Sequence, residues 1–203
     1  MTQGVSSPQG SWLTPDWDVE PNVHALSTLR GGGLSAQAYA SFNLAQHVGD
    51  DSEHVRANRA LLRAAAKLPS DPLWLQQEHG IHVVEHPGPA ATVAMQPRAD
   101  AAVAFEPGRV CVVLTADCLP VVFADRAGTR IGVAHAGWRG LVGGVLEATV
   151  AALQAEPDQL VAWLGPAIGS AAFEVGAEVR DAFVARDAAN DDAFVRNEAG
   201  RFQ

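Results

Sequence analysis

The stretch from Leu114 to Gly140 constrains the fold of this chain more than any other segment. It contains two apolar runs, "LPVVFAD" and "RIGVAHAG", separated by the turn sequence "RAGT". Such runs are typical of buried strands, and the short turn between them predicts a hairpin. Cys118 directly precedes the first run, and His135 lies near the end of the second, before the sequence "AGWRG". A thiol and an imidazole are therefore expected at strand ends, where side chains tend to reach a cleft.

The segments around this hairpin interleave helical and strand-like patterns without strict alternation. Apolar residues recur at helical spacing from residue 51 to 69, with Ser52 as the expected N-cap and Pro69 as the stop. Further strand-like runs cover residues 72–86, 98–105, 109–117 and 160–165, and further helices are expected over 141–154 and 175–187. This order predicts an α+β fold, a single domain of layered mixed β-sheets flanked by helices.

The two ends of the chain differ from this pattern. Residues 1–22 are polar and contain prolines, and we expect them to form a loosely held N-terminal arm before a catalytic domain over residues 23–203. The final sequence, "DDAFVRNEAGRFQ", ends within what looks like a turn leading into another element. The domain is therefore expected to be truncated, lacking its C-terminal segment.

Composition excludes several classes of protein. The chain has 203 residues, of which 48% are hydrophobic and 18% charged, as in soluble globular proteins. Its net charge of -9 argues against a nucleic-acid partner or an anionic membrane. Two cysteines, Cys111 and Cys118, cannot supply a disulfide framework, and no run is long enough to span a bilayer. We therefore expect a cytoplasmic protein with neither nucleic acid nor membrane as partner.

Three residues stand out as candidates for chemistry. His79, in "QEHG", precedes a glycine, and His135, in "VAHAG", precedes an Ala-Gly pair. Both lie at expected strand ends, and Cys118 occupies a similar position. Two imidazoles and a thiolate can hold zinc with the fourth position open to water, as in catalytic zinc sites. Because the three residues are far apart in sequence, ordinary packing roles explain them as well.

The same residues permit two other interpretations. Cys118 beside His135 would form a thiolate–imidazolium pair, the nucleophile of a metal-free hydrolase. A copper site with two histidines, a cysteine and a weak axial methionine is the third possibility, but the methionines are Met1 and Met95 and there is no His-x-His pair. The residues alone therefore support a multicopper oxidase poorly.

A candidate anion site lies directly after His135. Gly137 and Gly140 flank Trp138 and Arg139 before the expected start of a helix. Backbone N–H groups, the helix dipole and a guanidinium can together hold phosphate. A tight strand-to-helix turn with a solvated arginine explains the sequence equally well, and the same two interpretations apply to Arg30, which precedes three glycines.

Six strings together resemble one protein family over nearly the whole chain, from about Val23 onward. They are "STLRGGGLS", "SFNLAQHVGDD", "QEHG", "LTADCLPVVFAD", "GVAHAGWRG" and "WLGPAIGSAAFEVG", in this order. They resemble the YfiH-type laccase-domain family, which has been named both polyphenol oxidase and purine nucleoside phosphorylase. The Asp-Cys-Leu-Pro and His-Ala-Gly-Trp-Arg-Gly strings carry most of the specificity.

The resemblance implies functional residues at matching positions. It makes His79, Cys118 and His135 the ligands of a zinc ion, with copper as the alternative metal. It also places Asn43, from "SFNL", and Arg30 in the substrate pocket. Two departures are notable: Glu78 stands where the family has an apolar residue, and the family continues beyond the end of this chain with a further segment.

The activity that the resemblance implies is phosphorolysis of purine nucleosides, yielding a free base and ribose-1-phosphate, with adenosine deaminase activity as well. The expected partners are therefore purine nucleosides and phosphate. Three alternatives stay open: a copper-dependent polyphenol oxidase, a metal-free cysteine hydrolase, and a non-enzymatic domain with a structural metal.

Overall fold

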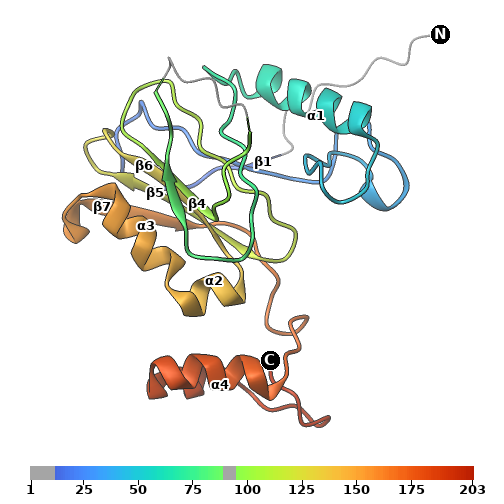
Figure 1. Cartoon of the computed structure of the whole chain (residues 1–203), viewed down its shortest axis with the longest axis vertical. Helices are drawn as coiled ribbons and strands as arrows, with labels where there is room; N and C mark the ends of the chain where they lie inside the picture. Colours follow the sequence, from blue (N-terminus) through green and yellow to red (C-terminus); the bar gives the residue numbers. More distant parts are fainter. Residues whose placement is uncertain (1–11, 89–94) are drawn as a thin grey trace.

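The computed structural model describes residues 12–88 and 95–203, which form a mixed sheet flanked by helices (Figure 1). The strands of this sheet are β3 (Val83–Glu85), β4 (Ala101–Ala104), β5 (Leu119–Asp125), β6 (Ile131–Ala136) and β7 (Leu160–Leu164). Their spatial order is β3-β4-β6-β5-β7, and β3 and β4 are parallel while the other pairs are antiparallel. This architecture confirms the predicted α+β fold, and the pairing of β5 with β6 confirms the hairpin.

Helices and a small second sheet complete the described structure. They are α1 (Ser52–Ala65), α2 (Trp138–Gly143), α3 (Val145–Leu153), α4 (Ala177–Arg186), the 3-10 helices η1 (Gln37–Tyr39), η2 (Pro157–Gln159) and η3 (Ala188–Ala193), and the paired strands β1 (Trp12–Leu13) and β2 (Ser27–Thr28). Helix α3 packs on β3, β4 and β6, whereas α4 contacts α2 and η3 and lies at the end of the molecule away from the sheet (Figure 1). None of the helices in the described residues combines the length and hydrophobicity that crossing a membrane requires.

The central strands are apolar on both faces because each face has its own core. In β4, Ala101 and Val103 pack in one core with Val145 and Leu153 of α3, whereas Ala102 belongs to a second core on the opposite face. Side chains alternate between the two faces of a strand, so burial of both faces requires a continuous apolar run. This is the pattern that the sequence shows for β5 and β6.

The second core is formed by extended chain rather than by a helix. Leu73 and Leu75 are buried there against the face of the sheet opposite α3. Their segment is held by isolated bridges that pair Leu73 with Cys111 and Gln76 with Arg98. This segment then continues into the loop that contains His79, so its packing fixes where that loop meets the sheet.

Two predicted helices differ from the structure at their ends. The N-cap of α1 is Asp51 rather than Ser52, because the Asp51 carboxylate accepts the Glu53 N–H at 2.8 Å. The helix expected over residues 141–154 starts earlier, at Trp138, and is divided into α2 and α3 at Gly144. Gly144 has a φ of 102°, a left-handed conformation that side chains disfavour and that ends the first helix.

The strands expected over residues 72–86 and 109–117 are mostly extended loops. The first contributes only β3 to the sheet, and the second pairs through the single bridge at Cys111. At Leu114 the backbone N–H and C=O are both bonded by the side-chain amide of Gln77, so the ladder is replaced by a side chain. A hydrophobic run alone does not reveal that a side chain takes the place of a neighbouring strand here.

Residues 12–22 contact the folded domain, in contrast to the expectation of a loosely held arm. Strand β1 pairs with β2, Asp18 forms an ion pair with Arg126 at 2.6 Å, and the Asn22 amide donates to the Gly128 carbonyl at 2.9 Å. The remainder of the expected arm, residues 1–11, lies outside the described residues. The domain boundary at residue 22 stays a prediction.

The turn between β5 and β6 depends on a buried carboxylate, Asp125. It accepts hydrogen bonds from the backbone N–H groups of Thr129 and Arg130 and from the Thr129 hydroxyl. Burial acts to raise the pKa of Asp125, but these hydrogen bonds outweigh it and hold the pKa below its ordinary value. The ionised carboxylate therefore stabilises the folded state.

We predict that Asp125→Asn lowers the free energy of unfolding at neutral pH by about 1–3 kcal/mol, because the amide cannot accept all three hydrogen bonds. Since the pKa is lower in the folded state, this contribution is present above the unfolded aspartate pKa of about 3.9 and is lost as pH falls through the folded value. The difference in free energy of unfolding between wild type and variant should therefore become smaller in acid. Urea unfolding measured from pH 7 to about pH 3 checks this, and a difference that stays constant contradicts it.

Candidate metal centre

His79, Cys118 and His135 meet at one end of the sheet. One potential ligand atom from each residue lies within 4.8 Å of the other two, and Cys118 Sγ is 3.8 Å from His79 Nε2. The two imidazole rings are 4.6 Å apart between centroids and 74° apart in orientation. Tetrahedral zinc with ordinary bond lengths separates such ligand atoms by roughly 3.3–3.6 Å, so the donors need only a small approach to hold it.

The register of the hairpin explains why Cys118 and His135 lie together. Leu119 pairs with Ala136 and Pro120 pairs with His135. Extended by one residue, this register sets Cys118, which precedes β5, opposite Gly137, which follows β6. Alternate residues share a face, so Cys118 and His135 lie on the same face, diagonally across the strand pair.

Gly137 provides the space in which the three side chains meet. A Cβ atom added at this position would lie 2.6 Å from His79 Cδ2 and 3.0 Å from Cys118 Sγ, closer than van der Waals contact allows. Its backbone, with φ −61° and ψ 154°, is open to any residue, so the requirement is steric rather than conformational. The site therefore requires a glycine at position 137, because any side chain there would occupy the space of its ligands.

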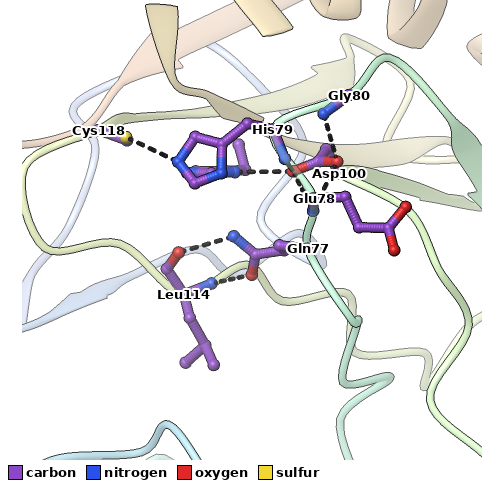
Figure 2. A network of polar contacts seen from close by, with 8 residues as sticks. Gln77, Glu78, His79, Gly80, Asp100, Leu114 and Cys118 are labelled. Carbon is purple, nitrogen blue, oxygen red and sulfur yellow. Dashed lines mark hydrogen bonds and ion pairs between the residues drawn. The ribbon is translucent and has the colours of Figure 1, made fainter. Parts of the chain in front are cut away.

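His79 reaches the cluster from a tight loop. It has a φ of 59°, in the left-handed region that residues other than glycine rarely adopt. Asp100 accepts the backbone N–H groups of Glu78, His79 and Gly80, at 3.1, 2.9 and 2.7 Å (Figure 2). The carboxylate thus holds the loop in this conformation, and sequence reasoning did not identify Asp100.

The same carboxylate contacts His135. Asp100 Oδ1 lies 2.8 Å from His135 Nδ1, and both side chains are buried. Burial acts to raise the pKa of Asp100, but the hydrogen bonds from His135 and from the loop hold it below its ordinary value. Burial lowers the pKa of His135, against the opposing effect of Asp100, so the imidazole stays neutral at neutral pH and can act as a metal ligand.

Cys118 is connected to the His79 loop through Gln77. The Gln77 amide donates to the Leu114 carbonyl at 2.8 Å and accepts the Leu114 N–H at 2.7 Å, which fixes the segment leading to Cys118 (Figure 2). Burial, together with the charges of Asp117 and Asp100, raises the pKa of the Cys118 thiol. A thiolate at this position therefore needs a cation beside it, which a bound metal ion supplies.

The other predicted site residues make contacts outside this cluster. The Arg30 guanidinium donates to the Ala40 carbonyl at 3.0 Å, and the Asn43 amide donates to Asp50 at 2.9 Å. Arg139 is exposed and lies over the ring of Trp138, 4.3 Å from its centroid. The roles of Arg30, Asn43 and Arg139 in binding substrate stay predictions.

The sequence "GWRG" forms the first turn of α2 rather than a turn before it. The first bond of this helix joins the Leu141 N–H to the Gly137 carbonyl at 2.8 Å. Gly140 is closely packed, since a Cβ there would lie 2.9 Å from the carbonyl oxygen of Gly80. Anion binding by this turn stays a prediction.

Glu78, which departs from the family pattern, forms an ion pair with Arg98 at 2.5 Å. Both side chains of this pair are exposed. A surface ion pair therefore accounts for a carboxylate at this position beside the cluster.

Comparison with known proteins identifies the family. Residues 24–203 match the family described as multi-copper polyphenol oxidoreductase laccase. The chain belongs to this family. The predicted resemblance is thereby confirmed, and the match spans the residues that form the sheet and the metal-binding cluster.

Relatives in this laccase-domain family carry a different functional name. The protein named purine nucleoside phosphorylase YfiH from Escherichia coli K12 is 51% identical over 91% of this chain and 75% of its own length. A Pseudomonas aeruginosa protein named purine nucleoside phosphorylase is 51% identical over 95% of this chain and 77% of its own length. A crystal structure of a Neisseria meningitidis protein is 46% identical, covers 95% of this chain and 77% of its own, and has a TM-score of 0.88.

Proposed function

We propose that this protein is a zinc-dependent purine nucleoside phosphorylase that also deaminates adenosine. The observation that carries the proposal is the cluster of His79, Cys118 and His135, found in a chain that is 51% identical to proteins named purine nucleoside phosphorylase. The proposed metal ligands are these three residues.

The donor set favours zinc over copper. Two imidazoles and one thiolate leave one position of a tetrahedral zinc site for water or substrate. A copper site of the electron-transfer type has a weak axial methionine, but Met95 is 82% exposed and Met1 lies outside the described residues. When bound, zinc would supply a Lewis acid and lower the pKa of a coordinated water.

The access to the cluster suits a catalytic rather than a structural site. His135 is buried, Cys118 is half-buried and His79 is exposed, so the cluster is covered at His135 and open to solvent on the side of His79. Substrate would approach along the open side. A structural site would instead have a fourth protein ligand covering it.

In phosphorolysis, a phosphate oxygen attacks C1′ of the ribose while the bond from C1′ to the purine nitrogen breaks. The purine departs with the electron pair of that bond and takes up a proton. We assign the binding of phosphate to Arg139 and the backbone of the Gly137–Gly140 turn, and the binding of the nucleoside to Arg30 and Asn43. Their task is to orient the two reactants and to balance the charge on phosphate.

Adenosine deamination at the same site would replace the C6 amino group with oxygen from water, releasing ammonia. This reaction needs a water that is activated near the purine ring, and in other deaminases a zinc ion activates that water. The open side of the cluster provides the entry for the base.

Chromatography of nucleoside incubations tests the proposal. With zinc-loaded protein, inosine should yield hypoxanthine and ribose-1-phosphate only when phosphate is present, and adenosine without phosphate should yield inosine. If zinc-loaded protein releases no base in the presence of phosphate, the phosphorylase assignment is wrong. Oxygen consumption with a phenol and stoichiometric copper would instead establish the oxidase.

The metal-free hydrolase is the less favoured alternative. In the described structure the thiol of Cys118 contacts Nε2 of His79 at 3.8 Å rather than His135, the partner expected for such a hydrolase. The raised pKa of the Cys118 thiol also opposes a free thiolate. A hydrolase of this kind would stay active after a chelator removes metal, whereas the proposed enzyme would lose activity.

A further inference from the structure

A single buried carboxylate, Asp100, connects two ligands of the candidate metal centre that are far apart in sequence. Its side chain is 1% exposed and accepts hydrogen bonds from the ring of His135 and from three consecutive backbone N–H groups of the His79 loop. A carboxylate has about four lone-pair directions, so these four donors use its whole capacity.

Sheet pairing places Asp100 beside His135. Ala101 pairs with Ala134, and the next position along β4 and β6 therefore sets Asp100 opposite His135. The His135 N–H donates to the Asp100 carbonyl at 2.7 Å, which continues the ladder by one residue. The two side chains share a face because they are cross-strand neighbours.

The contact with His135 determines which ring nitrogen carries the proton. A neutral imidazole has one N–H donor and one acceptor nitrogen, and an ionised carboxylate can only accept. The 2.8 Å contact with Asp100 Oδ1 therefore places the proton on His135 Nδ1. Nε2 is then the unprotonated nitrogen, in the form that binds a metal.

The contacts with the loop determine where His79 lies. A left-handed backbone is unfavourable for any residue other than glycine, and the His79 φ of 59° is of this kind. Hydrogen bonds to a charged acceptor are stronger than those between neutral groups. The bonds from the N–H groups of Glu78, His79 and Gly80 to Asp100 are therefore sufficient to hold the loop in this conformation.

We propose that Asp100 is a positioning residue of the metal centre, which orients His135 through its ring and His79 through its backbone. This inference rests on the proposed use of His79, Cys118 and His135 as metal ligands. It assigns to Asp100 an effect on metal affinity in addition to its effect on folding.

The variant Asp100→Asn tests this role, because one amide oxygen offers only two lone pairs and the amide N–H₂ is itself a donor. We expect zinc affinity, measured by competition with a chelator, to fall by about 10–100-fold, as is typical when a residue that orients a metal ligand is lost. Nitrogen NMR of the zinc-free protein gives an independent readout. His135 should be protonated at Nδ1 in wild type and a mixture of tautomers in the variant, with His135→Gln identifying the signals.

Asp125→Asn is the matched control. Asp125 is also buried and accepts backbone N–H groups, but it lies at the far end of β5 from Cys118. The Asp125→Asn variant should have a lower free energy of unfolding, but its zinc affinity should change by no more than about twofold, in contrast to the 10–100-fold loss expected for Asp100→Asn. This control separates positioning of the ligands from general destabilisation.

The outcomes separate this inference from the proposed function. Wild-type protein that binds no metal would refute the metal centre itself. Wild type and Asp100→Asn with equal zinc affinity would refute only the role of Asp100. If Asp100→Asn does not fold, the wild-type spectrum decides: His135 protonated at Nε2 in the zinc-free protein overturns the inference, and protonation at Nδ1 supports it.

Discussion

Cys118→Ala is expected to abolish tight zinc binding and, with it, phosphorolysis of purine nucleosides. Cys118 contributes the thiolate of the three-residue cluster, so the variant retains only the two histidines. Loss of a ligand should cost more than loss of a residue that orients one, so we expect affinity to fall by more than about 100-fold. Metal analysis after dialysis against a chelator measures the effect, with chromatography of inosine and phosphate as the activity readout.

Cys111→Ala is the control for this variant. Cys111 is a half-buried cysteine that packs in the second core and pairs with Leu73 through an isolated bridge. Burial raises its pKa to about 12, so it is a neutral packing residue. The Cys111→Ala variant should have a free energy of unfolding lower by about 1 kcal/mol and should bind zinc as wild type does. A Cys118→Ala protein that keeps wild-type zinc affinity would contradict the proposed centre.

Gly137→Ala is expected to disrupt the centre without removing any ligand. The added methyl group would lie 2.6 Å from the His79 ring and 3.0 Å from the Cys118 sulfur, so at least one of these side chains must move. Overpacking of this kind typically costs about 1–3 kcal/mol. If the apo protein relieves the clash by moving a ligand, a comparable cost appears in binding, and zinc affinity should fall by about tenfold or more, because about 1.4 kcal/mol is a factor of ten.

Gly132→Ala, in the strand β6 that Gly137 follows, is the matched control. A Cβ at Gly132 would approach Leu153, Thr149 and Val103 no closer than 3.4 Å, an ordinary packing distance. This variant should fold and bind zinc as wild type does. Equal zinc affinity in Gly137→Ala and Gly132→Ala would show that the space at residue 137 is not needed for the centre.

Several features of the fold and the site follow directly from sequence pattern. The β5–β6 hairpin was predictable because two apolar runs flank a short polar turn, and the structure confirms this pairing. Cys118 and His135 were identifiable as candidates because they lie at the ends of these runs. His79 was identifiable in the same way, although the segment around it is an extended loop rather than the strand that its hydrophobicity suggested.

Other features depend on tertiary contacts that no local pattern contains. Asp100 precedes the run "AAVA", and its importance is visible only once the register sets it opposite His135. The Gln77 side chain replaces a strand partner for Leu114, which pattern analysis reads as a continuing strand. At α1, a choice between adjacent capping residues, Asp51 and Ser52, was decided by which side chain reaches the Glu53 N–H.

X-ray absorption at the metal edge tests the central claim most directly, because it reports the identity of the bound metal and the atoms around it. For protein purified without added metal, we predict a zinc edge with one sulfur at about 2.3 Å and at least two nitrogen ligands at about 2.0–2.1 Å. A spectrum without a sulfur shell, or a sample without bound metal, would contradict a centre formed by His79, Cys118 and His135.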